Sequence, residues 1–205
     1  MLKKCFLITV FILIMGFAAA CDGEPEETAA DDPAEEPGNM MGKVEEPLNM
    51  DGSSEGYPAD PIEVSGATIY LAHDEEFLYV LMEAEVEGWL SVGINEPGGG
   101  MDGANMVLGY LTDAGEPAYR DDVGRGHAHS EAESPAVAQP FVDRAEGKTV
   151  LEFAYPLSFP ADEGYNIEEI VTGETYALII GMHRNSDDIS TKHSTRGSAE
   201  FQVQP

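Results

Sequence analysis

Apolar residues recur at every second position through much of this 205-residue chain. In residues 148–157, KTVLEFAYPL, an extended strand would carry Leu151, Phe153, Tyr155 and Leu157 on one face. A period of two is typical of a β-strand, whereas an amphipathic helix repeats at 3.6. Turn-forming residues follow about every ten positions, and only NIEEIV, residues 166–171, suggests a single helical turn. The pattern therefore predicts an all-β protein.

The expected strands share this alternation, or are apolar on both faces. They cover residues 77–86, 88–94, 104–111, 116–122, 148–157, 176–183 and 198–204. The short link at Glu87 and Gly88 predicts a hairpin between the first two. Residues 176–183 are apolar on both faces, as in a central strand, and Ala199, Phe201 and Val203 should point inward. Short strands at this spacing predict an immunoglobulin-like, two-sheet antiparallel β-sandwich over residues 61–205.

The first twenty residues have the layout of an export signal. Lys3 and Lys4 precede a thirteen-residue apolar run, which is too short to span a membrane and is typical of a secretory signal peptide. The following AAAC resembles the lipobox of bacterial lipoproteins, in which Cys21 would be lipidated. The alternative is ordinary cleavage after Ala20. We expect an exported protein, lipid-anchored to the periplasmic or cell-surface face of a bacterial membrane.

Cysteine usage agrees with this expectation. Cys5 would leave with the signal peptide, so the mature chain would keep only Cys21. A lone cysteine forms no internal disulfide, and its position at the cleavage site favours lipidation.

Residues 21–60 predict an acidic disordered tether. From Asp22 to Asp60 the chain has thirteen acidic residues against one lysine. Such a composition buries too little apolar surface to offset the entropy lost on ordering. We therefore expect this segment to be dispensable for folding.

Residues 61–205 are acidic in their own right, with 26 acidic and 7 basic residues. This charge argues against nucleic acid as a partner and against direct adhesion to anionic lipid, which leaves the lipid anchor as the membrane contact. We find neither a paired nucleophile and base nor a phosphate-binding loop. An electron-transfer or binding module is therefore expected rather than an enzyme.

A glycine-rich segment carries a family resemblance. Residues 88–111, GWLSVGINEPGGGMDGANMVLGYL, resemble the signature of the DOMON domain, a β-sandwich module named after dopamine β-monooxygenase N-terminal regions. The matching positions are Trp89, Gly93, Met101, Gly103 and Ala104, and Asn105 stands where the family often has aspartate. Residues 112–128 and 176–203 are similar to later parts of the family pattern.

The resemblance implies a cofactor. Cytochrome members of the family hold a non-covalent b-type haem between a methionine and a histidine, at positions that match Met101 and His193. Iron with both ligands has no free position, so such a site suits single-electron transfer with a redox partner protein. Arg196 and Lys192 could pair with the haem propionates, and Trp89 could line the pocket.

Two other functions remain open. Some family members lack the axial pair, so the domain could be a haem-free module that binds a sugar or docks a protein. It could also be a purely structural surface lipoprotein.

The remaining histidines give one alternative metal site. His127 and His129 lie two apart in GHAHSEAES, and Glu131 extends the same face if the segment is extended. Imidazole suits copper and zinc, although a polar loop with idle histidines is equally consistent with the pattern. His183 is expected to be buried or at a strand edge, and His73 to face solvent.

Overall fold

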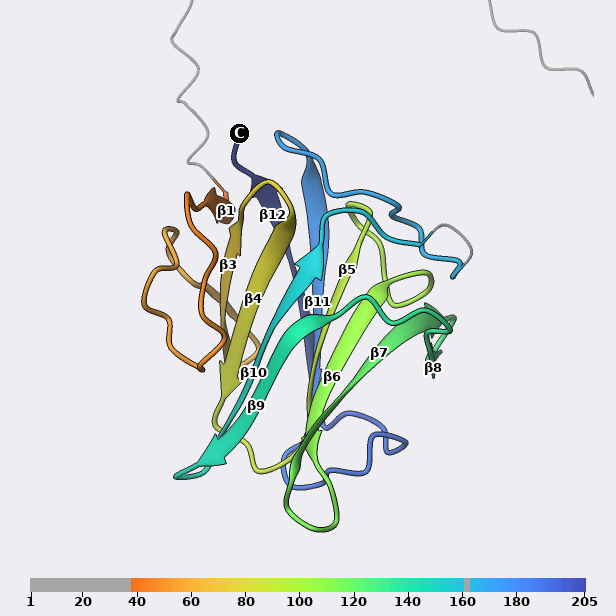
Figure 1. Ribbon diagram of the computed structural model, residues 1–205. Helices are drawn as coiled ribbons and strands as arrows, with labels where there is room; N and C mark the ends of the chain where they lie inside the picture. The colour runs from red at the N-terminus through yellow and green to blue at the C-terminus, as the bar shows by residue number, and fades with distance from the viewer. Residues whose placement is uncertain (1–37, 161–162) are drawn as a thin grey trace, which may run out of the picture. The chain divides into compact units, whose positions relative to one another are not determined.

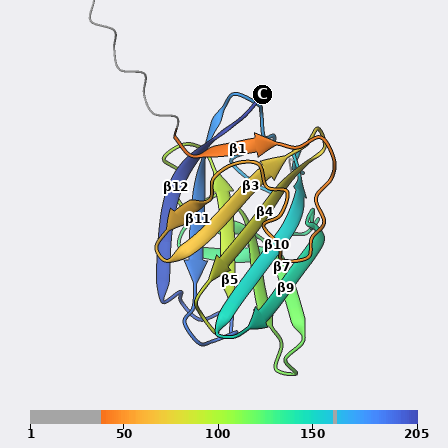
Figure 2. The ribbon, with the colours of Figure 1, turned by 90° about the vertical axis from the view of Figure 1, so that its left-hand side faces the viewer.

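The computed structural model describes residues 38–160 and 163–205, and these form two β-sheets packed face to face (Figures 1 and 2). The strands are β1 (Met40–Lys43), β2 (Ile62–Val64), β3 (Ala67–His73), β4 (Phe77–Ala84), β5 (Leu90–Asn95), β6 (Asn105–Leu111), β7 (Pro117–Arg125), β8 (Ala128–Glu131), β9 (Ala138–Ala145), β10 (Lys148–Pro156), β11 (Thr175–Met182) and β12 (Thr195–Val203). The expected signal peptide and Cys21 lie outside the described residues. Within those residues, no helix is long and apolar enough to cross a membrane.

Strand β1 joins the two sheets. Sheet A has the order β8-β7-β6-β5-β11-β12-β1, and sheet B has the order β1-β3-β4-β10-β9, with β2 paired to β3. The first half of β1 runs parallel to β12 and the second half parallel to β3. The other strand pairs are antiparallel. The predicted all-β sandwich is confirmed, with β1 as its parallel element.

The core lies between the sheets, on the faces that the alternation predicts. Leu151, Phe153 and Tyr155 are buried on the inner face of β10, and Phe201 and Val203 are buried on β12. Strand β11 lies between β5 and β12, so the expectation of a central strand is also confirmed.

The expected hairpin between the strands before and after Glu87 is wrong. Strand β4 pairs with β3 and β10 in sheet B, whereas β5 pairs with β6 and β11 in sheet A. The link therefore crosses between sheets, and Trp89 donates its N–H to the carbonyl of Ser186 at 3.0 Å. Residues 166–171 form no helical turn either. Alternation shows which faces are buried, but it does not identify the neighbouring strand.

Residues 38–60 belong to the folded domain, which corrects the expected boundary at residue 60. Met41 of β1 is fully buried, and the segment after β1, residues 44–60, crosses the outer face of sheet B; we call it the strap. The strap places a few spaced apolar side chains on a small apolar patch of sheet B. These side chains are Val44, Leu48, Met50 and Tyr57, and the patch consists of Ala72, Tyr79 and Ala154.

A buried carboxylate fastens the strap. Glu152, on the outer face of β10, is fully buried and accepts two hydrogen bonds. The Gly52 N–H donates to its Oε2 at 2.7 Å, and the Tyr57 hydroxyl donates to its Oε1 at 3.0 Å. Average composition conceals such contacts, because a few well-placed residues are enough to make them.

The strap should respond to pH through Glu152. Burial raises the pKa of Glu152, although the two donors oppose the shift. A folded pKa above the unfolded value means that this carboxyl favours the fold at low pH, and that its contribution is lost as pH rises through the folded pKa. Glu152→Gln removes the titration and keeps an acceptor for Gly52. We expect its free energy of unfolding, relative to wild type, to rise as pH increases above the ordinary glutamate pKa of 4.5.

Urea denaturation at a series of pH values measures this difference. Glu55→Gln, on the exposed part of the strap, is the matched control and should follow wild type. A Glu152→Gln difference that is constant with pH would contradict the prediction.

Candidate functional site

The outer face of sheet A is the surface on which the predicted ligands lie. Gly93 and Gly181 mark this face, because a Cβ on Gly93 would contact Met106, Ile179 and Ala104 rather than the core. Val92 and Val107, the neighbours of Gly93 and Met106 in sequence, point into the core instead. The loop of residues 96–104 borders one end of this face, and the loop of residues 183–194 borders the other.

Asn95 holds the glycine-rich loop in place. This fully buried side chain donates to the carbonyls of Gly100 at 2.7 Å and Asp102 at 2.9 Å. Its Oδ1 accepts the N–H of Glu96 at 2.8 Å and the amide of Asn166 at 3.1 Å. All the hydrogen-bonding capacity of the amide is used, so the loop is preorganised rather than loose.

Met101 lies over the end of β7, with its side chain half-buried. Its carbonyl oxygen is 1.6 Å from the position that a Cβ on Gly124 would take, so only glycine fits there. The Gly103 N–H donates to the Gly124 carbonyl at 3.0 Å, and the Gly126 N–H donates to Asp102 Oδ1 at 2.6 Å. The glycine loop is thus closed onto β7.

His193 lies at the opposite end of the face. It precedes β12, and its Cβ is 3.8 Å from the position that a Cβ on Gly181 would take. The half-buried ring has a lowered pKa, because burial and the charges of Arg196 and Lys192 disfavour its protonation. The neutral form of the imidazole is therefore favoured.

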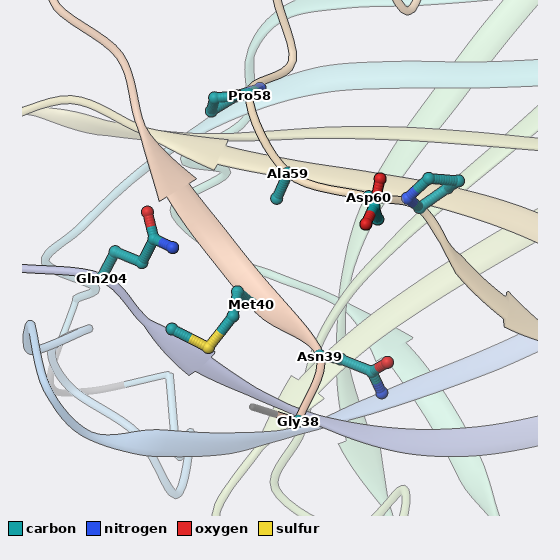
Figure 3. A pocket seen from close by; sticks show the side chains of 8 residues that line it. Gly38, Asn39, Met40, Pro58, Ala59, Asp60 and Gln204 are labelled. Carbon is teal, nitrogen blue, oxygen red and sulfur yellow. The ribbon is translucent and has the colours of Figure 1, made fainter. Parts of the chain in front are cut away.

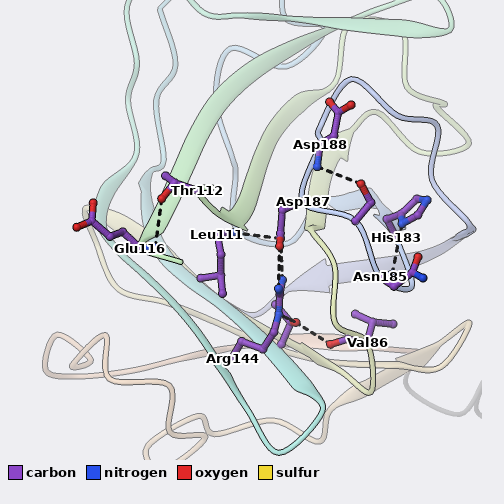
Figure 4. A network of polar contacts seen from close by, with 11 residues as sticks. Val86, Leu111, Thr112, Glu116, Arg144, His183, Asn185, Asp187 and Asp188 are labelled. Atoms are coloured by element: carbon purple, nitrogen blue, oxygen red, sulfur yellow. Dashed lines mark hydrogen bonds and ion pairs between the residues drawn. The ribbon is translucent and has the colours of Figure 1, made fainter. Parts of the chain in front are cut away.

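Asp187 anchors the His193 loop across the end of the sandwich (Figure 4). Arg144 on β9 donates two hydrogen bonds to its carboxylate, at 2.8 and 2.7 Å, and the Leu111 N–H donates a third at 3.1 Å. Burial opposes ionisation of this carboxyl, but these donors hold its pKa below the ordinary value. The loop connects β9 of sheet B with β6 of sheet A.

The structure does not bring Met101 and His193 together. Gly124, under Met101, and Gly181, beside His193, are separated by three strand spacings across the sheet and by four residues along it. At about 4.8 Å per spacing and about 3.3 Å per residue, the separation is roughly 20 Å. This separation, between the glycines beneath the two loops, places the Met101 and His193 loops at opposite ends of one face.

The surface between them does not fit a haem. A haem would need to lie against residues that the protein itself already covers. Trp89, Ser91, Met106 and Leu108 point to this face, yet their exposed fractions are 4%, 3%, 5% and 1%. Trp89, expected to line a haem pocket, instead packs over Gly181, with its ring atoms 3.5 and 3.7 Å from the Cβ position there.

The expected propionate partners are exposed. Lys192 and Arg196 lie on either side of His193, and Arg196 pairs with Gly181 across the β11–β12 ladder. They remain available to an anion at this end of the face.

His127 and His129 do not form a metal site with Glu131. His129 Nδ1 instead contacts the buried carboxylate of Asp122, to which Arg120 also donates from Nε and Nη2, both at 2.5 Å. Burial opposes ionisation of Asp122, but His129 and Arg120 lower its pKa. In the described part of the chain, no three His, Cys, Asp or Glu side chains are grouped to hold a metal ion.

The expectation that His73 faces solvent is wrong. Its ring is buried at the junction of β3 with the C-terminal end, and its nitrogens lie 3.0 Å from the Asp74 carbonyl and 2.9 Å from the Gln204 carbonyl. His183 is half-buried at the end of β11, as expected. Its backbone N–H donates to the Trp89 carbonyl at 2.9 Å.

Sequence reasoning missed the buried polar residues that fix the framework. Asp121, for example, points between the sheets and accepts the Tyr155 hydroxyl at 2.7 Å and the Ala136 N–H at 2.6 Å. Burial raises its pKa, and these donors oppose the shift. The signal available in the sequence was Asp121 itself, a charged residue at a position of β7 that faces the core.

A surface hollow of about 500 Å³ lies elsewhere, beside β1 (Figure 3). It contains none of the residues expected to form a site. Its lining comes from the start of the described chain, the end of the strap and the C-terminal end: Gly38, Asn39, Met40, Pro58, Ala59, Asp60, Pro61 and Gln204.

Comparison with known proteins identifies the fold. No protein-family model matches the chain, and no curated protein matches it. The cytochrome b domain of pyranose dehydrogenase from Coprinopsis cinerea is similar in structure, with a TM-score of 0.50 and 13% identity over 66% of this chain and 75% of that one. The cytochrome domain of Myriococcum thermophilum cellobiose dehydrogenase gives 0.51 and 13% over 70% and 80%.

A carbohydrate-binding module is equally similar. The family 9 module from Caldicellulosiruptor kristjanssonii, in complex with cellotriose, has a TM-score of 0.50 and 10% identity over 81% of this chain and 93% of that one. Identities this low show the fold alone. The two cytochrome domains are of the DOMON type, so the chain has a DOMON-like β-sandwich fold, as the sequence resemblance predicted.

Proposed function

We propose that this protein is an exported, non-catalytic binding module, held at a bacterial membrane surface by lipid on Cys21. The observation that carries the proposal is the outer face of sheet A, where two fixed loops border a surface already covered by the protein's own side chains. This geometry favours recognition at the loops over a cofactor between them.

Preorganised loops support a binding role. Asn95 makes three hydrogen bonds to the Met101 loop, and Asp187 fixes the His193 loop through three. Loops on a rigid sandwich are a common location for binding residues. The similar carbohydrate-binding module, in complex with cellotriose, is a binding domain of the same fold.

Single-electron transfer through b-type haem is the second candidate. The cytochrome domains share the fold, and Met101 and His193 lie on one face. A neutral His193 is also in the protonation state that iron requires. Such a protein would pass electrons to a redox partner protein. Haem would have to separate the covering side chains and draw the loops together.

Visible spectroscopy of the purified mature protein, alone and after addition of haem, distinguishes the two candidates. We expect no stoichiometric low-spin, six-coordinate spectrum. Met101→Ala and His193→Ala should behave like wild type in this titration. A low-spin spectrum in wild type that both substitutions abolish would overturn the binding-module proposal in favour of the cytochrome.

The lipid anchor is tested at the N-terminus. We expect mass spectrometry of the protein from its native host to show a diacylglycerol-modified Cys21 as the first residue, because the apolar run and AAAC provide both signals. Cys21→Ser is the control and should release the protein from the membrane fraction. A mature chain with an unmodified Cys21 would contradict the anchor.

A further inference from the structure

Three cationic side chains lie close to His193 in the sequence of an otherwise acidic protein. The chain has 39 acidic residues and only 10 lysines and arginines. Three of these ten lie within thirteen residues, at Arg184, Lys192 and Arg196, around His193. All three are exposed: Arg184 and Lys192 lie in the loop, and Arg196 lies at the start of β12. Three exposed cations within so short a stretch are unusual in so acidic a protein.

These charges are not neutralised within the described residues. The ion pairs there use Arg120, His129, Arg144 and Lys148 as cations. The nearby Asp187 is taken by Arg144. Asp188 is also occupied, because its carboxylate accepts the N–H and the hydroxyl of Ser190 at 3.0 and 2.6 Å. In the part of the chain that the structure describes, neither loop carboxylate forms an ion pair with Arg184, Lys192 or Arg196.

The cations converge on one corner, which we call the His193 corner and define by Lys192, His193 and Arg196. Arg196 pairs with Gly181 across the ladder, and His193 Cβ lies near the same glycine. The Arg196 and Lys192 charges both act on the His193 ring and lower its pKa. The buried Trp89 ring packs beside Gly181 and borders one side of this corner.

We propose that the His193 corner binds a small oxyanion, either inorganic phosphate or the carboxylate of a free small molecule. The guanidinium of Arg196 offers two parallel donors to such a group. Lys192 adds a point charge, and the neutral His193 ring adds one N–H donor. The inference rests on the proposed binding function and names the chemical class of its ligand.

Titration of the mature protein with sodium phosphate and with sodium glucuronate tests the inference. Binding is followed by calorimetry and by the ring proton resonances of His193, with sodium chloride at matched ionic strength as the reference. We expect a saturable shift of the His193 signals with at least one oxyanion and none with chloride. The anion that binds more tightly shows whether the ligand is inorganic phosphate or a carboxylate.

Substitutions separate a site from general charge. Lys192→Gln with Arg196→Gln should weaken binding at least tenfold, whereas Lys43→Gln, an exposed cation on β1, should leave it unchanged. Equal shifts with all three salts, or equal weakening by Lys43→Gln, would overturn the inference. Because the titration uses haem-free protein, its failure is distinct from a low-spin haem spectrum, which would overturn the proposed function itself.

Discussion

Removal of residues 38–56 is expected to destabilise the protein severely. The deletion takes away β1, the strand that joins the sheets, and uncovers the apolar patch under the strap. Full burial of one large apolar side chain is worth about 1.5–3 kcal/mol, and Met41 alone is buried completely. With the strap contacts added, we expect a loss of about 4 kcal/mol or more, against a typical total of about 5–15 kcal/mol.

Circular dichroism and urea denaturation measure this loss. Removal of residues 22–36 is the matched control, because it shortens the acidic segment without touching β1 or the strap, and it should change the free energy of unfolding little. The prediction fails if the chain without residues 38–56 keeps its stability to within about 1 kcal/mol, the range of ordinary surface changes. The strap would then be part of the dispensable tether.

Gly124→Ala is expected to destabilise the domain and release the Met101 loop. The new methyl group would lie 1.6 Å from the Met101 carbonyl oxygen and 2.7 Å from its carbonyl carbon. These are backbone atoms, and Asn95 and Gly103 hold the same loop, so the loop has no simple way to move aside. Overpacking of this kind costs about 1–3 kcal/mol and sometimes more, and we expect the upper end.

Gly100→Ala provides the comparison within the same loop. A Cβ at Gly100 would meet no atom within 4 Å, so this change should cost little. Thermal denaturation of the two variants, with amide hydrogen exchange of the loop, separates a clash from a general effect of replacing glycine. Equal stability of both variants would show that the loop does not pack on β7 as described.

The sequence predicted β4, β5, β6, β7, β10, β11 and β12 because burial has a local signature, but it did not predict β1, β2, β3, β8 and β9. Leu151, Phe153 and Tyr155 alternate in the chain and are buried together in the core. The pairing of strands depends on residues far apart, and this is where prediction failed. The link at Glu87 and Gly88 looks like a hairpin, but backbone bonds of Glu87 and Trp89 to the later loop carry the chain into the other sheet.

The tether boundary failed for a different reason. Composition averages over a segment, and residues 38–60 are acidic on average. Their few apolar residues nevertheless match a patch on sheet B, and Glu152, far away in sequence, accepts hydrogen bonds from Gly52 and Tyr57. A local sequence pattern does not predict these hydrogen bonds, because their partners are about a hundred residues apart.

The candidate site was predicted in its parts but not in its geometry. The family resemblance named Met101 and His193, and both lie in loops that precede strands in the structure. It did not reveal at which end of the sheet each loop would lie, because that depends on β5 and β11 being antiparallel neighbours. The loops consequently border opposite ends of one face.

A distance between the two loops tests this account most directly. Spin labels at Gly100→Cys and Lys192→Cys, in a chain with Cys21→Ser, leave Met101 and His193 intact. Both label positions are open or exposed. Pulsed dipolar spectroscopy should give a distance on the order of 20 Å or more, from the strand and residue spacings, and added haem should leave it unchanged. A clearly shorter distance, or a shortening when haem is added, would contradict the separation of Met101 and His193.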